Sequence, residues 1–137
     1  MPLVVDASVA LTWCFDDEAT PETRALYDQL VTDSVAVPSI WPIELANILV
    51  ASERRRRITT ADTQHFIAIL DELDIQIHPM PADDIFHVLL PLARTSGLTS
   101  YDAAYLELAM RSGLPLATRD RALANAARRN GVTVIRC

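Results

Sequence analysis

Four acidic residues stand where a carboxylate can do chemistry. Asp6 directly follows the first short apolar run, Asp120 follows a later one, and Glu44 lies near the start of a long apolar helical segment. Asp102 heads an expected helix in which spacings of three, four and seven residues place it over apolar side chains. A carboxylate in such surroundings is costly to desolvate unless a positive charge compensates it.

The chemistry of such a group depends on whether the four carboxylates meet. If they do, they cannot all stay ionised without a cation, and lacking one, some of their pKa values would rise. Carboxylate oxygens select Mg²⁺ or Mn²⁺. A cation of this kind can activate water and stabilise charge on a phosphodiester during its cleavage.

Each acid also has a plain structural explanation. Asp6 or Ser8 can cap the helix that follows the first strand, and Asp120 can cap a later helix. Asp102 can favour its own helix simply by lying near the positive end of the helix dipole. If these are the only roles of the acids, the domain is catalytically inert.

The pattern of strands and helices predicts an α/β protein with three layers. Helices would cover both faces of a mostly parallel sheet of about five short strands. The expected strands are residues 3–5, 35–37, 75–77, 114–117 and 132–135. The expected helices are residues 7–15, 21–32, 41–57, 60–73, 82–95 with a kink at Pro91, 99–112 and 121–130. In this architecture all four acids can meet at the carboxyl edge of the sheet, although spacing alone does not show that they do.

Length and composition indicate one domain spanning residues 1–137. No apolar run approaches the roughly 20 residues of a membrane span, and no basic leader precedes the first strand, so we expect a cytoplasmic protein with no membrane partner. The two cysteines, Cys14 and Cys137, lack the spacing of a metal site and fit a reducing compartment. The net charge of −6 argues against binding nucleic acid by bulk electrostatics, but not against engaging a phosphate through metal ions.

A run of four arginines, Arg54, Arg55, Arg56 and Arg57, ends the long apolar helix. The simplest interpretation is a solvated helix end that complements the dipole. Contacts to phosphate or to an acidic partner are the alternative.

Four motifs occur in order along the chain. They are Val-Val-Asp6-Ala-Ser8, Pro42-Ile-Glu44-Leu-Ala-Asn47, Tyr101-Asp102-Ala-Ala-Tyr-Leu-Glu-Leu-Ala109 and Ala117-Thr118-Arg-Asp120. With these motifs the whole chain resembles a PIN domain, and more narrowly a VapC-type toxin of a type II toxin–antitoxin pair. The resemblance implies a PIN-like fold and a metal-dependent ribonuclease. It also implies a homodimer that is restrained by a small VapB-type antitoxin.

The resemblance assigns roles by position. Asp6 and Asp102 look like the principal ligands of Mg²⁺ or Mn²⁺, and Glu44 and Asp120 look like the acids that complete the site. The supporting polar residues, which would orient carboxylates or waters, are Ser8, Asn47 and Thr118.

Two functions follow as expectations. The first is a metal-dependent endoribonuclease toxin that cleaves RNA through the acidic site and is neutralised by its antitoxin. The alternative is a non-catalytic PIN scaffold that dimerises and acts as a co-repressor with the antitoxin, reaching DNA only through that complex.

Overall fold

Five strands form a single sheet in the spatial order β3-β2-β1-β4-β5. In the computed structural model, which describes residues 1–137, they are β1 (Leu3–Val5), β2 (Ser34–Pro38), β3 (Asp74–His78), β4 (Leu116–Ala117) and β5 (Val134–Ile135). All four pairs of neighbouring strands are parallel. The predicted sheet of about five short, mostly parallel strands is therefore confirmed, although the last two strands are shorter than the sequence indicated.

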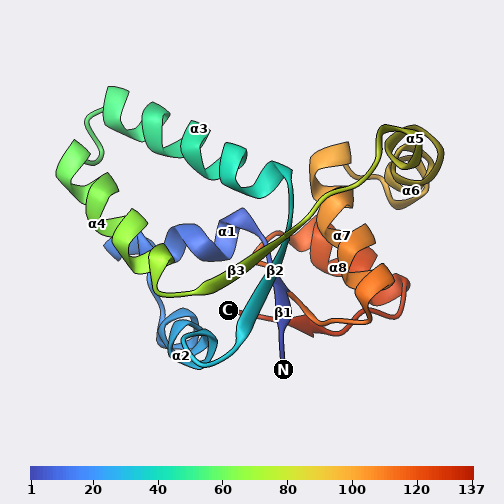
Figure 1. Cartoon of the computed structure of the whole chain (residues 1–137), viewed down its shortest axis with the longest axis horizontal. Helices are drawn as coiled ribbons and strands as arrows, with labels where there is room; N and C mark the ends of the chain where they lie inside the picture. Colours follow the sequence, from blue (N-terminus) through green and yellow to red (C-terminus); the bar gives the residue numbers. More distant parts are fainter.

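Helices connect the strands and make the two outer layers (Figure 1). They are α1 (Ala7–Ala10), α2 (Pro21–Leu30), α3 (Ile40–Arg54), α4 (Thr60–Asp71), α5 (Ala82–Asp84), α6 (Leu90–Ser96), α7 (Ser100–Ser112) and α8 (Arg121–Arg129). Figure 1 shows α1 to α4 on one side of the sheet and α5 to α8 on the other. The chain steps from β1 to β2 and β3 in one direction along the sheet, whereas β4 and β5 lie on the other side of β1. Because crossovers between parallel strands are right-handed, steps in opposite directions place their helices on opposite faces of the sheet. None of the helices combines the length and the apolar character that a membrane crossing requires.

The starts of α2, α4 and α7 and the end of α7 agree with the predicted start and stop signals, whereas α3 ends at Arg54 and not at Arg57. The Thr20 and Thr59 side chains both cap their helices in capping boxes, as expected at the starts of α2 and α4. Thr99 caps α7, and Gly113 ends it in the left-handed conformation at φ 65°. The helix that carries Asp102 is thus fixed at both ends by residues recognisable in the sequence.

Two helical predictions need correction. The helix expected to run to Phe15 is only the short α1, continued by a 3₁₀ turn at Leu11–Trp13. The expected kink at Pro91 is instead a π-helical stretch, Ile85–Leu89, between α5 and α6. Because Pro91 has no N–H to bond the carbonyl four residues back, the preceding turn can widen, and the Leu90 N–H reaches back five residues to Ile85.

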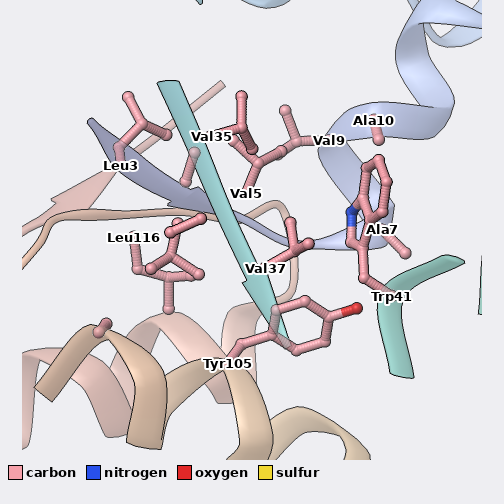
Figure 2. Packing of buried hydrophobic residues seen from close by; sticks show 14 of the residues in the cluster. Leu3, Val5, Ala7, Val9, Ala10, Val35, Val37, Trp41, Tyr105 and Leu116 are labelled. Carbon is pink, nitrogen blue, oxygen red and sulfur yellow. The ribbon is translucent and has the colours of Figure 1, made fainter. Parts of the chain in front are cut away.

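The core lies on both faces of β1 and β2. Figure 2 shows Val5, Val35 and Val37 packed between the α1 side and the α7 side of the sheet. On α7, Tyr105, Leu106 and Ala109 are almost completely buried, so the apolar stripe predicted below Asp102 is confirmed. The strand ends that carry the acids are therefore anchored in the best-packed part of the molecule.

Candidate acidic site

The carboxyl ends of β1 and β4 meet at the point where the strand order reverses. The chain leaves β1 toward β2, while β4 pairs with the opposite edge of β1. In open α/β sheets, ligand sites form at this switch point. The Asp6 N–H donates to the Ala117 carbonyl oxygen at 3.2 Å, which joins the two strand ends directly above the core.

Asp6 is held by three hydrogen bonds. Its carboxylate accepts hydrogen bonds from the Val9 N–H at 3.2 Å, from the Ser8 hydroxyl at 2.5 Å and from the Thr118 hydroxyl. The bond from Val9 caps α1. Burial raises the pKa of Asp6 above its ordinary value; these bonds oppose the rise, and the charge of Asp102 adds to it. Asp6 is therefore both a helix cap and a buried carboxylate whose charge is incompletely compensated.

Ser8 and Thr118 also hold the loop after β4. The Ser8 Oγ accepts from the Arg119 N–H at 3.1 Å, and the Thr118 Oγ1 accepts from the Asp120 N–H at 3.0 Å. Asp120 in turn accepts from the Leu123 N–H at 2.8 Å, so its capping of α8 is confirmed. Two short hydroxyl side chains thus tie Asp6 to the segment that carries Asp120.

Glu44 reaches the site from α3. The sequence indicated that Glu44 lies in the first turn of its helix. This helix begins at Ile40, so Glu44 in fact lies one turn further along. The Tyr105 hydroxyl donates to Glu44 Oε1 at 2.6 Å. Burial raises the pKa of Glu44, the bond from Tyr105 lowers it, and the charges of Asp102 and Asp6 raise it further.

Asp102 lies in the first turn of α7, which Thr99 caps. Burial raises the pKa of Asp102, the charge of Asp120 raises it further, and a hydrogen bond with Thr99 opposes the rise. A carboxylate whose only role is to favour the helix dipole would have its pKa lowered. Asp102 lies in the first turn of α7 and also lines the hollow beside Asp120, so the helix dipole is not its only electrostatic neighbour.

All four acids line one hollow of about 200 Å³, together with Ser8 and Tyr105. No three His, Cys, Asp or Glu side chains are grouped so that they hold a metal ion by themselves. The donors nevertheless fit a hydrated divalent cation, since Mg²⁺ in proteins keeps several waters and binds through one or two carboxylates. No basic side chain lines the hollow. Burial is the main cause of the raised pKa values of Asp6, Glu44 and Asp102.

The other residues predicted from the sequence lie in different surroundings. Ser8 and Thr118 contact Asp6, in keeping with a supporting role, whereas Asn47 is exposed on α3, outside the hollow and without a side-chain hydrogen bond. Tyr105 was missed as a site residue, because its position on the apolar stripe suggested only a core side chain. Its signal in the sequence was a hydroxyl three residues after Asp102, on the same face of the helix.

The arginine run divides into two parts. Arg57 pairs with Glu18 at 2.8 Å and with Asp17 at 3.1 Å, and its guanidinium carbon lies 3.7 Å from the centre of the Phe15 ring. This residue therefore fastens the α3–α4 turn to the segment after α1. The other three arginines of the run, Arg54, Arg55 and Arg56, are exposed and form no ion pair.

A second, larger hollow of about 320 Å³ is mainly apolar. It lies between the start of α3, the segment around Ile85 and the first turns of α7. Two of its lining side chains are strongly exposed, Ile43 at 65% and Tyr101 at 61%. Exposed apolar groups gathered around a hollow commonly mark a surface for a protein partner.

Comparison with known proteins places the chain in a family context. A family model for the PIN domain matches residues 3–129. The solved structure of PAE2754 from Pyrobaculum aerophilum has a TM-score of 0.72 and 26% identity, with 98% of this chain and 89% of that chain covered. A search among curated proteins gave no match.

Two further solved structures share the fold at lower identity. VapBC2 from Rickettsia felis, bound to a DNA fragment from their promoter, has a TM-score of 0.67 and 13% identity, with 99% of this chain and 98% of that chain covered. FitAcB from Neisseria gonorrhoeae has a TM-score of 0.58 and 20% identity, with 98% of this chain and 96% of that chain covered. The α/β/α arrangement seen here is thus found in proteins of widely different sequence.

The uncompensated charge predicts an unusual mutational effect. In metal-free buffer at pH 7, Asp102→Asn should raise the free energy of unfolding, by about 1 kcal/mol or less, because solvent screens this half-exposed group. The folded state raises the pKa of Asp102, so it binds a proton more readily than the unfolded state does. The advantage of the variant should therefore shrink as the pH falls through the raised pKa. Urea unfolding of the variant and the wild type at a series of pH values from 7 down to below the ordinary pKa of an aspartate measures both effects.

Asp62→Asn is the matched control. Hydrogen bonds with Thr59 lower the pKa of Asp62, so its loss should destabilise the protein at pH 7. An Asp102→Asn variant that is less stable than the wild type in metal-free buffer would contradict this account of the site.

Proposed function

The chain belongs to the PIN domain family, and from this membership we propose that it is a Mg²⁺- or Mn²⁺-dependent endoribonuclease, the VapC-type toxin of a toxin–antitoxin pair. One observation carries the proposal. Four carboxylates from four different parts of the chain line a single hollow at the switch point of a parallel sheet. In three of them, Asp6, Glu44 and Asp102, the pKa is raised by burial and by neighbouring acids, as expected of a site that binds a cation.

Each residue has a definite task in this proposal. Asp6 and Asp102 are the principal ligands, and Glu44 and Asp120 complete the acidic site. A bound divalent cation would activate water and offset charge on the phosphodiester. Glu44 is also placed to accept a proton, since its pKa is raised and its Oε2 has no hydrogen-bond partner.

RNA is the proposed substrate, and the choice of RNA over DNA rests on the resemblance to VapC-type toxins. The protein itself offers little bulk attraction for a nucleic acid, with a net charge of −6. Binding of the phosphate would therefore depend strongly on the cation. We place this activity in the cytoplasm, together with its substrate.

An antitoxin is the proposed protein partner, in keeping with the likeness to VapBC2 and FitAcB. Contact with promoter DNA would come only through the toxin–antitoxin complex. Arg54, Arg55 and Arg56 are proposed to bind this partner, because they are exposed, free of ion pairs and at the far end of α3 from Glu44. Arg54 lies ten residues after Glu44 on the same helix, so the proposed partner surface lies roughly 15 Å from Glu44 along the helix axis.

A second copy of the chain is the proposed occupant of the apolar hollow around Ile43 and Tyr101. The same hollow is lined by Glu107 and Arg111, which pair with each other at 2.6 Å. A two-fold axis brings the same patch of two copies face to face, which would set the Glu107 and Arg111 of each copy against the apolar groups and charges of the other. The functional toxin would then be a homodimer.

Cleavage of RNA tests the enzymatic proposal. Purified, partner-free protein should cleave RNA when Mg²⁺ or Mn²⁺ is present, and Asp6→Asn should lower the rate by more than about 100-fold. The basis is that loss of outer residues around a metal already costs roughly 10- to 100-fold. Gel analysis of labelled RNA, with and without metal, measures the rate.

The control for this experiment is Asp28→Asn, which changes an exposed acid on α2 and should cleave like the wild type. Cleavage by Asp6→Asn at the wild-type rate would refute the assignment. Absence of cleavage by the wild type in either metal would favour the alternative of a non-catalytic scaffold.

The arginine assignment has its own test. Changing Arg54, Arg55 and Arg56 together to Gln should weaken the complex with the small co-encoded antitoxin about tenfold or more, which is about 1.4 kcal/mol. The matched control changes three other exposed arginines, Arg94, Arg121 and Arg128, to Gln. Titration calorimetry on the purified pair gives both affinities.

Two results would count against this surface. One is an equal loss of antitoxin affinity in both triple variants, which would indicate an effect of net charge only. The other is an unchanged affinity for the antitoxin together with a weaker dependence of RNA binding on salt. The slope of log affinity against log salt concentration would then fall by about 0.7 for each lost phosphate contact, which would assign the arginines to RNA.

A further inference from the structure

Tyr105 joins the core to the acidic hollow. Its ring is buried, with 1% of the residue exposed, and its hydroxyl donates to Glu44 Oε1 at 2.6 Å. In Figure 2 the side chain extends from α7 past the end of β2 toward the start of α3, where Trp41 lies. Tyr105 also lines the hollow formed by the four acids.

The hydroxyl of Tyr105 is not needed for packing. A phenylalanine ring would fill the same apolar space, whereas a buried hydroxyl must find a hydrogen-bond partner to offset its desolvation. The only partner of this hydroxyl is Glu44. What distinguishes a tyrosine from a phenylalanine at this position is therefore its link to an acid of the site.

A single hydrogen bond holds the carboxylate of Glu44, on a side chain longer than those of the three aspartates. Hydroxyl and backbone groups hold Asp6, and the backbone N–H of Leu123 holds Asp120. Glu44 has a longer side chain on a helix of the opposite layer, and its one hydrogen bond comes from Tyr105. Without that bond, its three side-chain torsions would be restrained by packing alone.

We infer that Tyr105 is a positioning residue of the acidic site, which holds Glu44 through Oε1 and leaves Oε2 for a bound divalent cation or its waters. The inference rests on the proposed function, because it gives Glu44 a role toward the cation. It adds that α7 serves the site twice. It carries Asp102 and, three residues later on the same face, the hydroxyl that fixes an acid from the opposite layer.

Binding of Mn²⁺ alone tests the inference without relying on catalysis. Electron paramagnetic resonance of free Mn²⁺, titrated with the partner-free protein, gives the affinity. Tyr105→Phe should weaken Mn²⁺ binding by roughly 10- to 100-fold, the usual effect of losing a residue that orients a ligand. In a Glu44→Ala background the same substitution should cause no further loss, since Tyr105 acts through Glu44.

Tyr27→Phe is the matched control. Tyr27 also donates a hydrogen bond from a partly buried hydroxyl, to the Ile69 carbonyl oxygen at 2.8 Å, but it lies outside the acidic hollow. Both tyrosine variants should lose some thermal stability, whereas only Tyr105→Phe should lose affinity for Mn²⁺. A purely structural role for Tyr105 would make the two variants alike.

The remaining outcomes separate this inference from the proposed function. Wild-type Mn²⁺ affinity in Tyr105→Phe, or an equal loss with and without Glu44, would overturn the positioning role. Mn²⁺ binding that depends on Tyr105, in a protein that cleaves no RNA, would support the positioning role and overturn the nuclease proposal. A wild-type protein that binds no Mn²⁺ would overturn both.

Discussion

Uncompensated negative charge at the carboxyl edge of the sheet is the constraint on which the rest of the site depends. Burial and mutual repulsion raise the pKa values of Asp6, Glu44 and Asp102 together. A fold selected for stability alone would separate such groups or pair them with arginines. Of the twelve arginines, none forms an ion pair with any of the four acids that line the hollow. The fold tolerates the repulsion between these carboxylates because the helices and strands that carry them are well packed and hold them in place.

Asp6 is held by short polar side chains and not by opposite charges. Ser8 and Thr118 hold Asp6, and through two backbone N–H groups they also hold the loop that carries Asp120. Hydroxyl groups of this kind fix a carboxylate without neutralising it. The arrangement therefore leaves the charge of the hollow unneutralised while limiting the motion of Asp6 and of the loop that carries Asp120.

Much of this could be predicted from the sequence. Capping signals at Thr59, Thr99 and Gly113, and apolar runs of strand length, gave the order of the elements and their parallel pairing. The convergence of the acids could be expected only as a possibility, because spacing along the chain does not fix distances in space. The bond between Tyr105 and Glu44, which lie 61 residues apart, could not be predicted at all. It depends on how α3 and α7 meet across the sheet, which is a property of tertiary packing.

The position of a bound cation tests most directly whether the four acids form a metal site. Crystals of the partner-free protein soaked in Mn²⁺ and measured at the manganese absorption edge would show the ion by its anomalous scattering. We expect a peak in the hollow between Asp6, Glu44, Asp102 and Asp120, and its loss in Asp102→Asn crystals. A well-ordered soaked crystal with no peak in the hollow, or with manganese only elsewhere on the surface, would show that the four acids do not form a metal site.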